Sequence, residues 1–246
     1  MLQDLQQSFT QLGAEFISPL TVLSRKQLAC RAYLADWDGV FNNGHKASTT
    51  LGSSFSEPDA MGLNMLRFSS WLRHDRMPLM GIVTGELNPA SFSLALRDHY
   101  DFVFFRVNHK TMALDWLNRE RGMADHHIGF MMDDVLDLSI ASRVNLKLLV
   151  NRLGSPLFKE LIRHREYADY ISGMDGANHA VREICELLIG LNGNFSETME
   201  RRVKFIGEYS KFLSQRNDIQ TRFLTAGPNG MEELSLQQVQ QLVSLG

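Results

Sequence analysis

The 246-residue sequence has few of the features that mark specialised classes of protein. Only two cysteines, Cys30 and Cys185, are present, too few for a disulfide framework and too far apart for a cysteine-based zinc knuckle. No apolar run approaches the ~20 residues that a membrane-spanning helix needs. Excess positive charge is also lacking, because 25 basic residues face 28 acidic ones. We therefore expect neither nucleic acid nor a membrane among its partners.

The N-terminus also lacks the basic and apolar regions of a secretory signal, so we expect a cytoplasmic protein. Hydrophobic residues make up 44% of the sequence and charged residues 22%, near the averages for globular proteins. This much apolar surface favours a folded chain over a disordered one.

Apolar strands alternate with helices through the middle of the sequence. The expected strands are 32–35, 79–83, 102–105, 128–132 and 146–150. The expected helices are 3–17, 60–74, one beginning at Asn88-Pro89, 110–121, 135–142, 156–164 and 178–191. This alternation predicts an α/β fold with a parallel sheet covered by helices on both faces. The active site of such a sheet lies at the carboxyl ends of its strands.

Two regions lie outside this pattern. Residues 45–58, rich in Ser and Thr, are expected to form a hairpin or a mobile flap. After residue 192 we expect one long helix from Ser196 to about 215, then a linker at 225–230 and a short helix near the end. The expected division is an N-terminal helical extension, a catalytic domain and a C-terminal helical extension, at residues 1–27, 28–191 and 192–246.

Chemically active side chains follow four consecutive strands. In chain order they are Asp36 and Asp38, Thr84, Lys110, and the cluster of Asp133, Asp134 and Asp137. Alone, the Asp-x-Asp-Gly at the first strand end is a weak signal that also fits a polar turn or a structural cation site. Together the set suits phosphoryl transfer, which uses a carboxylate nucleophile, hard oxygen ligands for Mg²⁺, and a hydroxyl and an ammonium for the phosphoryl oxygens. A second carboxylate can serve as general acid and base.

These residues resemble the motifs of the haloacid dehalogenase superfamily of aspartate-nucleophile phosphatases. Its four motifs are matched in order by residues 33–40, 81–85, Lys110 and 128–138. Within the superfamily, the sequence is similar to the 3-deoxy-D-manno-octulosonate 8-phosphate phosphatases and to related domains of sialic acid biosynthesis. That narrower similarity is carried by residues 36–41, 55–62, 108–110, 133–138 and 180–185. The resemblance implies a Rossmann-like fold without a separate cap domain.

The resemblance also implies a role for each site residue. Asp36 would be the nucleophile and a Mg²⁺ ligand, and Asp38 the general acid/base that also binds Mg²⁺ through its backbone carbonyl. Thr84 and Lys110 would hold the phosphoryl oxygens, and Asp133 would complete the metal site. The supporting residues would be Asp134, Asp137 and Gly85, and the residues facing the substrate would be Asp59 and Glu86.

Three positions depart from the pattern of that family. Glu86 stands where the family has arginine, so it would repel a phosphate or a sugar-acid carboxylate. Met132 replaces a glycine and is expected to narrow the loop around the metal. Residues 176–179 are poorer in glycine than the family's stretch. Because no catalytic group is lost, these changes favour an altered substrate over lost chemistry.

The intervals between the motifs leave no room for a cap domain, because a flap and one helix fill the interval from Asp38 to Gly85. In the subfamily that this sequence resembles, the chains form tetramers in which a neighbour's flap closes the site. We therefore expect a homo-oligomer, with a tetramer favoured. The flap and the helix expected at 196–215 are the candidate lids.

The sequence thus predicts a Mg²⁺-dependent phosphatase that acts on a sugar-acid phosphate or a related small phosphorylated metabolite through an aspartyl-phosphate. Two alternatives stay open: a phosphatase-like assembly module with little turnover, and a phosphotransferase or phosphomutase that uses the same intermediate. Trp37, between the two aspartates, either shapes the leaving-group side of the site or packs on the sheet.

Overall fold

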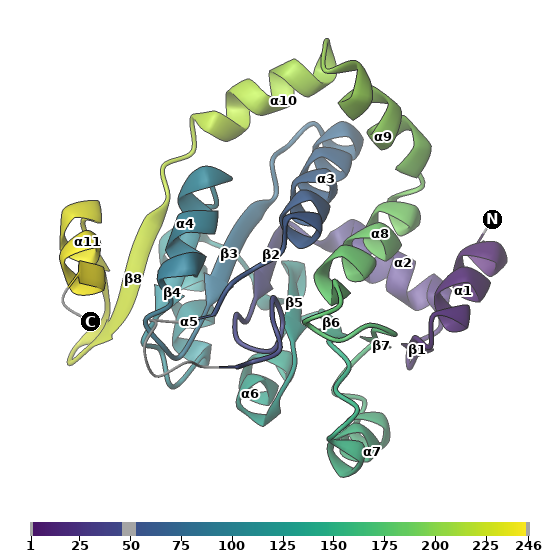
Figure 1. Ribbon diagram of the computed structural model, residues 1–246, viewed down its shortest axis with the longest axis horizontal. Coiled ribbons are helices and arrows are strands. Elements are labelled where there is room, and N and C mark those ends of the chain that lie inside the picture. Colours follow the sequence, from purple (N-terminus) through teal and green to yellow (C-terminus); the bar gives the residue numbers. More distant parts are fainter. Residues whose placement is uncertain (1, 46–52, 245–246) are drawn as a thin grey trace.

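The computed structural model describes residues 2–45 and 53–244. Within these residues one nine-stranded sheet has the order β1-β7-β6-β5-β2-β3-β4-β8-β9 (Figure 1). Neighbouring strands are parallel from β7 to β8, and the edge strands β1 and β9 are antiparallel to their neighbours. The strands are β1 (Glu15–Phe16), β2 (Ala32–Ala35), β3 (Leu79–Val83), β4 (Phe102–Phe105), β5 (Ile128–Met132), β6 (Leu146–Leu149), β7 (Tyr170–Ile171), β8 (Arg222–Gly227) and β9 (Gly230–Leu234).

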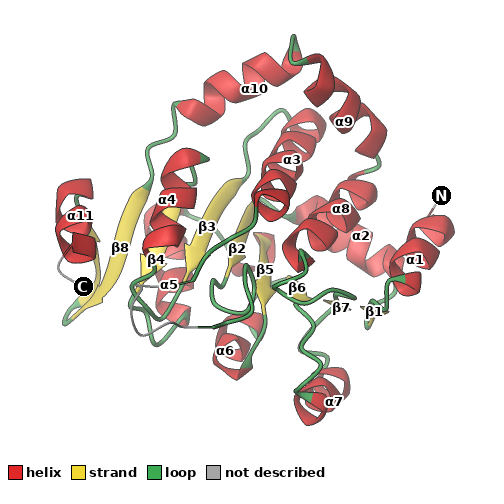
Figure 2. Cartoon of the chain, in the orientation of Figure 1, coloured by secondary structure: helices red, strands yellow, loops and turns green. Residues whose placement is uncertain are grey.

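Helices cover both faces of the sheet, which confirms the predicted fold class (Figure 2). The α-helices are α1 (Leu2–Gln11), α2 (Leu20–Ala29), α3 (Glu57–His74), α4 (Pro89–Arg97), α5 (Thr111–Arg121), α6 (Leu138–Ala141), α7 (Pro156–Arg165), α8 (Ala180–Asn192), α9 (Phe195–Lys204), α10 (Glu208–Asn217) and α11 (Leu236–Ser244). Short 3₁₀ turns, η1 (Asp125–His127) and η2 (Val135–Asp137), flank β5. None of the helices within the described ranges is both long enough and apolar enough to cross a membrane.

Two hydrophobic cores sandwich the sheet. Tyr33 and Ala35 of β2 pack into one core with residues of α2, α3, α4 and α8. Ala32 and Leu34 pack into the other core with residues of α5, α6 and α7. Because successive side chains of a strand point to opposite faces, all four residues of β2 are buried. Its continuous apolar run is therefore what a central parallel strand requires.

The N-terminal segment differs from the single helix expected at 3–17. The helix ends at Gln11, because Gly13 turns the chain with a φ of 92°. Glu15 and Phe16 then pair with β7 as the edge strand β1. A second helix, α2, follows Pro19, and the sequence did not predict it. The spacing of Leu5, Phe9, Leu12 and Phe16 fits a helix, but the turn at Gly13 overrides it.

The C-terminal segment contains two helices where one was expected at 196–215. Phe205 and Gly207 adopt left-handed φ values of 53° and 64°, which separate α9 from α10. The first of these helices is capped at Asn194 rather than at Ser196. We call residues 193–221 the C-terminal strap, because α9 and α10 arch past α3 and lead to β8 near the edge of the sheet (Figure 1).

The linker expected at 225–230 is wrong, because these residues belong to a β-hairpin. Strand β8 lies beside β4, with Phe102 opposite Arg222, and β9 folds back on β8. Pro228 thus marks a tight turn within the sheet. The C-terminal extension is therefore not only helical, since it supplies two strands to the same sheet. The flap expected at 45–58 is described only at its two ends, because 46–52 lie outside the described residues.

Candidate active site

A cavity of about 460 Å³ lies where β2, β3, β4 and β5 end. Its walls contain nearly all of the site residues predicted from the sequence. These are Asp36, Asp38, Thr84, Gly85, Glu86, Lys110, Asp133, Asp134 and Asp137. The cavity thus lies at the carboxyl ends of the parallel strands, where the fold places active sites.

Backbone pairing places the reactive side chains just past the strand ends. The amide of Asp36 donates to the carbonyl of Met131 at 2.9 Å, and that of Thr84 donates to the carbonyl of Phe104 at 2.8 Å. Trp37 is fully buried in a hydrophobic core and stacks on Phe41, with ring centroids 4.7 Å apart. Of the two interpretations of Trp37, packing on the sheet is therefore the one that the structure supports.

Lys110 joins two carboxylates at the floor of the cavity. Its Nζ lies 2.6 Å from Asp36 Oδ1 and donates to Asp137 Oδ1 at 2.5 Å. Burial works to lower the pKa of this lysine, but the charges of Asp36 and Asp137 outweigh burial and raise it. Lys110 therefore remains an ammonium that can meet a developing negative charge.

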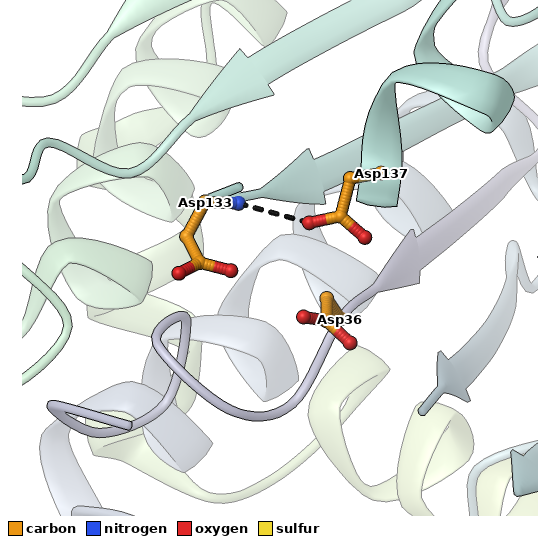
Figure 3. Close-up of side chains that lie close together, drawn as sticks. All are labelled: Asp36, Asp133 and Asp137. Atoms are coloured by element: carbon orange, nitrogen blue, oxygen red, sulfur yellow. Dashed lines mark hydrogen bonds between the residues drawn. The ribbon is translucent and has the colours of Figure 1, made fainter. Parts of the chain in front are cut away.

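Asp137 organises the loop that follows β5. Its Oδ2 accepts a hydrogen bond from the amide of Asp133 at 3.2 Å (Figure 3). Asp134 caps the turn by accepting from the amide of Val135 at 2.7 Å. The same carboxylate holds Lys110 through its other oxygen. One side chain thus fixes both the acidic loop and the ammonium.

The carboxylates of Asp36, Asp133 and Asp137 form a cluster that fits a divalent cation. Each offers an oxygen, and these oxygens lie within 4.8 Å of one another. Burial, followed by repulsion from neighbouring carboxylates, raises the pKa of Asp36 to about 7 and that of Asp133 to about 8. Bound Mg²⁺ would relieve this repulsion, and it prefers such hard oxygen ligands. Lys110 engages one oxygen of Asp137 and backbone amides engage the other, so Asp36 and Asp133 are the better ligands.

Gly39, the glycine of the Asp-x-Asp-Gly motif, is required by the geometry of this cluster. Its φ of 89° lies in the left-handed region that favours glycine. A Cβ at this position would also overlap the carboxylate of Asp133 and the guanidinium of Arg152. The glycine therefore allows the loop after β2 to approach the loop after β5 closely.

Two polar residues that the sequence did not single out for the site hold Asp38 and Thr84. Asn88 Nδ2 donates to Thr84 Oγ1 at 2.9 Å and to Asp38 Oδ2 at 3.2 Å. Ser53 Oγ donates to Asp38 Oδ1. Asn88 was expected only as the N-cap of α4, and it holds that position without a side-chain capping bond. Its side chain is thus available to the site.

The sequence also missed Arg152, which lines the cavity from the loop after β6. Its guanidinium pairs with Asp133 and lies 3.3 Å from Asp134 Oδ2. The available signal was its position after a fifth apolar strand, because the four motifs follow only the first four of these strands.

Asp59 and Met132 lie outside the cavity lining. Asp59 is fully buried at the start of α3, where it accepts hydrogen bonds from Ser56 Oγ at 2.5 Å and from the amide of Arg182 at 2.8 Å. It thus ties α3 to α8. Met132 was expected to narrow the loop around the metal, but its side chain is buried in a hydrophobic core and does not do so. Glu86, in contrast, lines the cavity.

No family model matches the chain, and no curated protein matches it. Solved structures do. A structure from Pseudomonas syringae, named a probable YrbI family phosphatase, is 25% identical with a TM-score of 0.61, over 76% of this chain and 99% of that one. A 3-deoxy-D-manno-octulosonate 8-phosphate phosphatase from Moraxella catarrhalis, in complex with magnesium, phosphate and KDO, is 23% identical with a TM-score of 0.60, over 72% and 96%.

A third similar structure is the cobalt-bound deoxy-D-mannose-octulosonate 8-phosphate phosphatase (YrbI) from Haemophilus influenzae. It is 19% identical with a TM-score of 0.58, over 70% of this chain and 94% of that one. The fold is thus that of the haloacid dehalogenase phosphatases, which are phosphoric monoester hydrolases. Within that class the chain resembles the YrbI and 3-deoxy-D-manno-octulosonate 8-phosphate phosphatases, which confirms the resemblance drawn from the four motifs.

Proposed function

We propose that this protein is a Mg²⁺-dependent phosphatase that hydrolyses a sugar-acid phosphate, such as a 3-deoxy-octulosonate 8-phosphate or a nonulosonate 9-phosphate. The observation that carries the proposal is the buried pairing of Asp36 with Lys110, at 2.6 Å, beside the carboxylate of Asp133. A nucleophile, a cation for the phosphoryl oxygens and a metal-binding group thus meet at one point of the cavity.

The proposed reaction has two steps. A carboxylate oxygen of Asp36 attacks phosphorus and forms an aspartyl-phosphate, while Asp38 gives a proton to the departing alkoxide. Asp38 then takes a proton from water, which attacks phosphorus, releases inorganic phosphate and restores Asp36. Lys110 and Thr84 hold the phosphoryl oxygens in both steps. Mg²⁺, held by Asp36, Asp133 and the backbone carbonyl of Asp38, would supply positive charge against the phosphate.

The substrate class is supported by the named relatives, one of which holds magnesium, phosphate and KDO. We also propose a cytoplasmic homo-oligomer, with a tetramer favoured. Both described cysteines are free thiols, which is usual in a reducing compartment. Val135 and Leu136 are exposed beside the cavity, and Leu136 lines it, so a second subunit that covered the mouth would bury them.

A phosphate-release assay tests the proposed function. Wild-type protein is given a panel of sugar-acid phosphates and sugar phosphates, with Mg²⁺ or with EDTA. We expect phosphate to be released from sugar-acid phosphates when Mg²⁺ is present and not with EDTA. In Asp36→Asn the rate of release should fall by at least about a thousandfold. Asp125→Asn, a change at the surface turn η1, is the matched control and should keep full activity. The proposal is wrong if no substrate releases phosphate or if Asp36→Asn turns over normally.

The same intermediate would serve a phosphotransferase, so acceptors are added to the assay. Transfer of the phosphoryl group to added sugars, in competition with water, would favour that alternative over hydrolysis.

A further inference from the structure

Arg152 has an unusual place among the residues that line the cavity. Among the described residues there, six are acidic and only Lys110 and Arg152 are basic. Lys110 is buried and its ammonium is held by two carboxylates. The side chain of Arg152 is 40% exposed and pairs with Asp133 and Asp134 at the wall of the cavity. Arg152 is therefore the more accessible of these two cations.

A second cavity, of about 250 Å³, adjoins the first at Arg152. Arg152 and Asn43 line both cavities. The other walls of the second cavity are mostly polar or lack a large side chain: Gly39, Asn42, Asn151, Leu153, Asp175, Gly176 and Ala177. A phosphate ester whose phosphoryl group lies at Asp36 has room there for a small polar leaving group. Amide side chains suit the hydroxyl groups of such a leaving group.

On the basis of the function proposed above, we propose that Arg152 is the specificity-determining residue for the leaving group, and that its guanidinium binds a carboxylate of the substrate. Arginine presents its donors as a planar fork that matches a carboxylate with two parallel hydrogen bonds. Asp133 and Asp134 hold the guanidinium of Arg152 at the boundary of the two cavities before substrate binds.

The charge of the cavity explains why this residue matters for an acidic substrate. Six carboxylates against two cations repel any anion that enters. Mg²⁺ would offset part of this charge beside the phosphate, but a carboxylate at the far end of the leaving group needs its own partner. Glu86 is one of the six acidic residues, so the arginine side is the favourable one for that carboxylate.

A matched pair of substrates tests the proposal. Gluconate 6-phosphate and glucitol 6-phosphate differ only in a carboxylate against a hydroxymethyl group. In Arg152→Gln we expect kcat/KM for the acid to fall by about 10- to 100-fold, mainly through KM, and that for glucitol 6-phosphate to change less than about threefold. Arg152→Lys should recover only part of the loss, because a point charge replaces the fork.

Arg143→Gln is the matched control, because Arg143 also bridges two aspartates, Asp115 and Asp125, but lies outside both cavities. It should leave both substrates unchanged. The proposal is overturned if Arg152→Gln slows both substrates by the same factor, since the residue would then act only through Asp133 and the metal. A titration of Mg²⁺ binding to the variant measures that effect directly.

Calorimetric binding of free gluconate and glucitol separates this inference from the proposed function. Wild type should bind gluconate more tightly than glucitol, and Arg152→Gln should lose that preference. If no phosphate ester is hydrolysed, the proposed function fails and this binding preference alone supports Arg152. If esters are hydrolysed and the variant keeps the preference, the assignment of Arg152 is wrong and the phosphatase stands.

Discussion

Lys110 balances two buried carboxylates, so we expect its charge to be needed for stability apart from its proposed role with the phosphoryl group. We expect Lys110→Met to lower the free energy of unfolding of the metal-free protein by about 3–5 kcal/mol, because Asp36 and Asp137 would then face each other unpaired. Urea denaturation measures the effect. Asp137→Asn in the same background should restore part of the loss by removing one of the charges. A change of less than about 1 kcal/mol in Lys110→Met would contradict this account.

The metal-free protein should become less stable as the pH rises. The folded chain raises the pKa of Asp36 to about 7 and of Asp133 to about 8, well above the ordinary value of 3.8. Between about pH 4 and pH 8 the folded state therefore binds more protons than the unfolded state, so the free energy of unfolding falls as the pH rises through this window.

Urea denaturation at pH 5 and pH 8, with EDTA or with Mg²⁺, measures this dependence. Mg²⁺ should offset the loss at pH 8, because it binds the deprotonated carboxylates. Asp133→Asn removes one of the titrating groups and should flatten the dependence in EDTA. Greater stability at pH 8 than at pH 5 in EDTA would show that other groups dominate.

Gly39→Ala should abolish Mg²⁺ binding and cost about 1–3 kcal/mol of stability, because the methyl group would strain the left-handed backbone and displace the Asp133 carboxylate. Gly122→Ala is its matched control, since Gly122 has a φ of 58° and nothing lies within 4 Å of an added Cβ. That variant should carry the backbone strain alone and bind Mg²⁺ normally. Calorimetric Mg²⁺ titration and thermal melting separate the two effects. Equal Mg²⁺ affinity in both variants would contradict the role given to Gly39.

The predicted and missed site residues differ in how locally they are encoded. Asp36 and Asp133 directly follow strands and Lys110 directly precedes α5, so their place at the sheet edge follows from the alternation of elements. The side chain of Asn88 makes no capping bond to α4 and donates to Asp38 instead. The side chain of Arg152 extends from the loop after β6 to Asp133 in the loop after β5. Such directions depend on tertiary contacts, and a sequence pattern does not specify them.

At the scale of elements, the same distinction separates the predicted strands from the others. The five central strands were predicted because each is an apolar run between turn residues. The two-residue strands β1 and β7 are too short to show a period. β8 and β9 were missed because the glycines and the proline at 225–230 also fit a linker. The break between α9 and α10 rests on a phenylalanine, Phe205, in a left-handed conformation that few non-glycine residues adopt.

The C-terminal strap is fixed to α3 by aromatic packing. Phe212 is fully buried, with its ring centroid 5.1 Å from that of Phe68, and Trp71 Nε1 donates to Gln215 at 2.7 Å. Phe212→Ala should therefore destabilise the protein by about 3–5 kcal/mol. Val203→Ala, at an exposed position of the same strap, should change stability by less than about 0.5 kcal/mol. Denaturant unfolding of both variants measures the contrast, and similar losses would show that the strap is not anchored at Phe212.

At the scale of the whole molecule, the C-terminal segment belongs to the sheet of the catalytic domain. A chain that ends at residue 221 would lose β8 and β9 and leave β4 as an open edge with the sequence Phe-Val-Phe-Phe. Unpaired apolar edges of this kind promote aggregation. We expect the shortened chain to be recovered mainly as aggregate, as measured by size-exclusion chromatography, whereas one that ends at residue 235 should remain dispersed because it keeps both strands. Recovery of a monodisperse, active protein ending at residue 221 would contradict this view.

The pairing of β4 with β8 also has a consequence for biosynthesis. Phe102 is translated 120 residues before its partner Arg222, so over that interval the nascent chain carries this phenylalanine-rich strand without the neighbour that covers it. Domains generally fold as units during synthesis, and exposed strand edges are where such intermediates misassemble. Completion of the sheet therefore has to await release of residues 222–234 from the ribosome, and we expect the growing chain to need a chaperone most in the interval between β4 and β8.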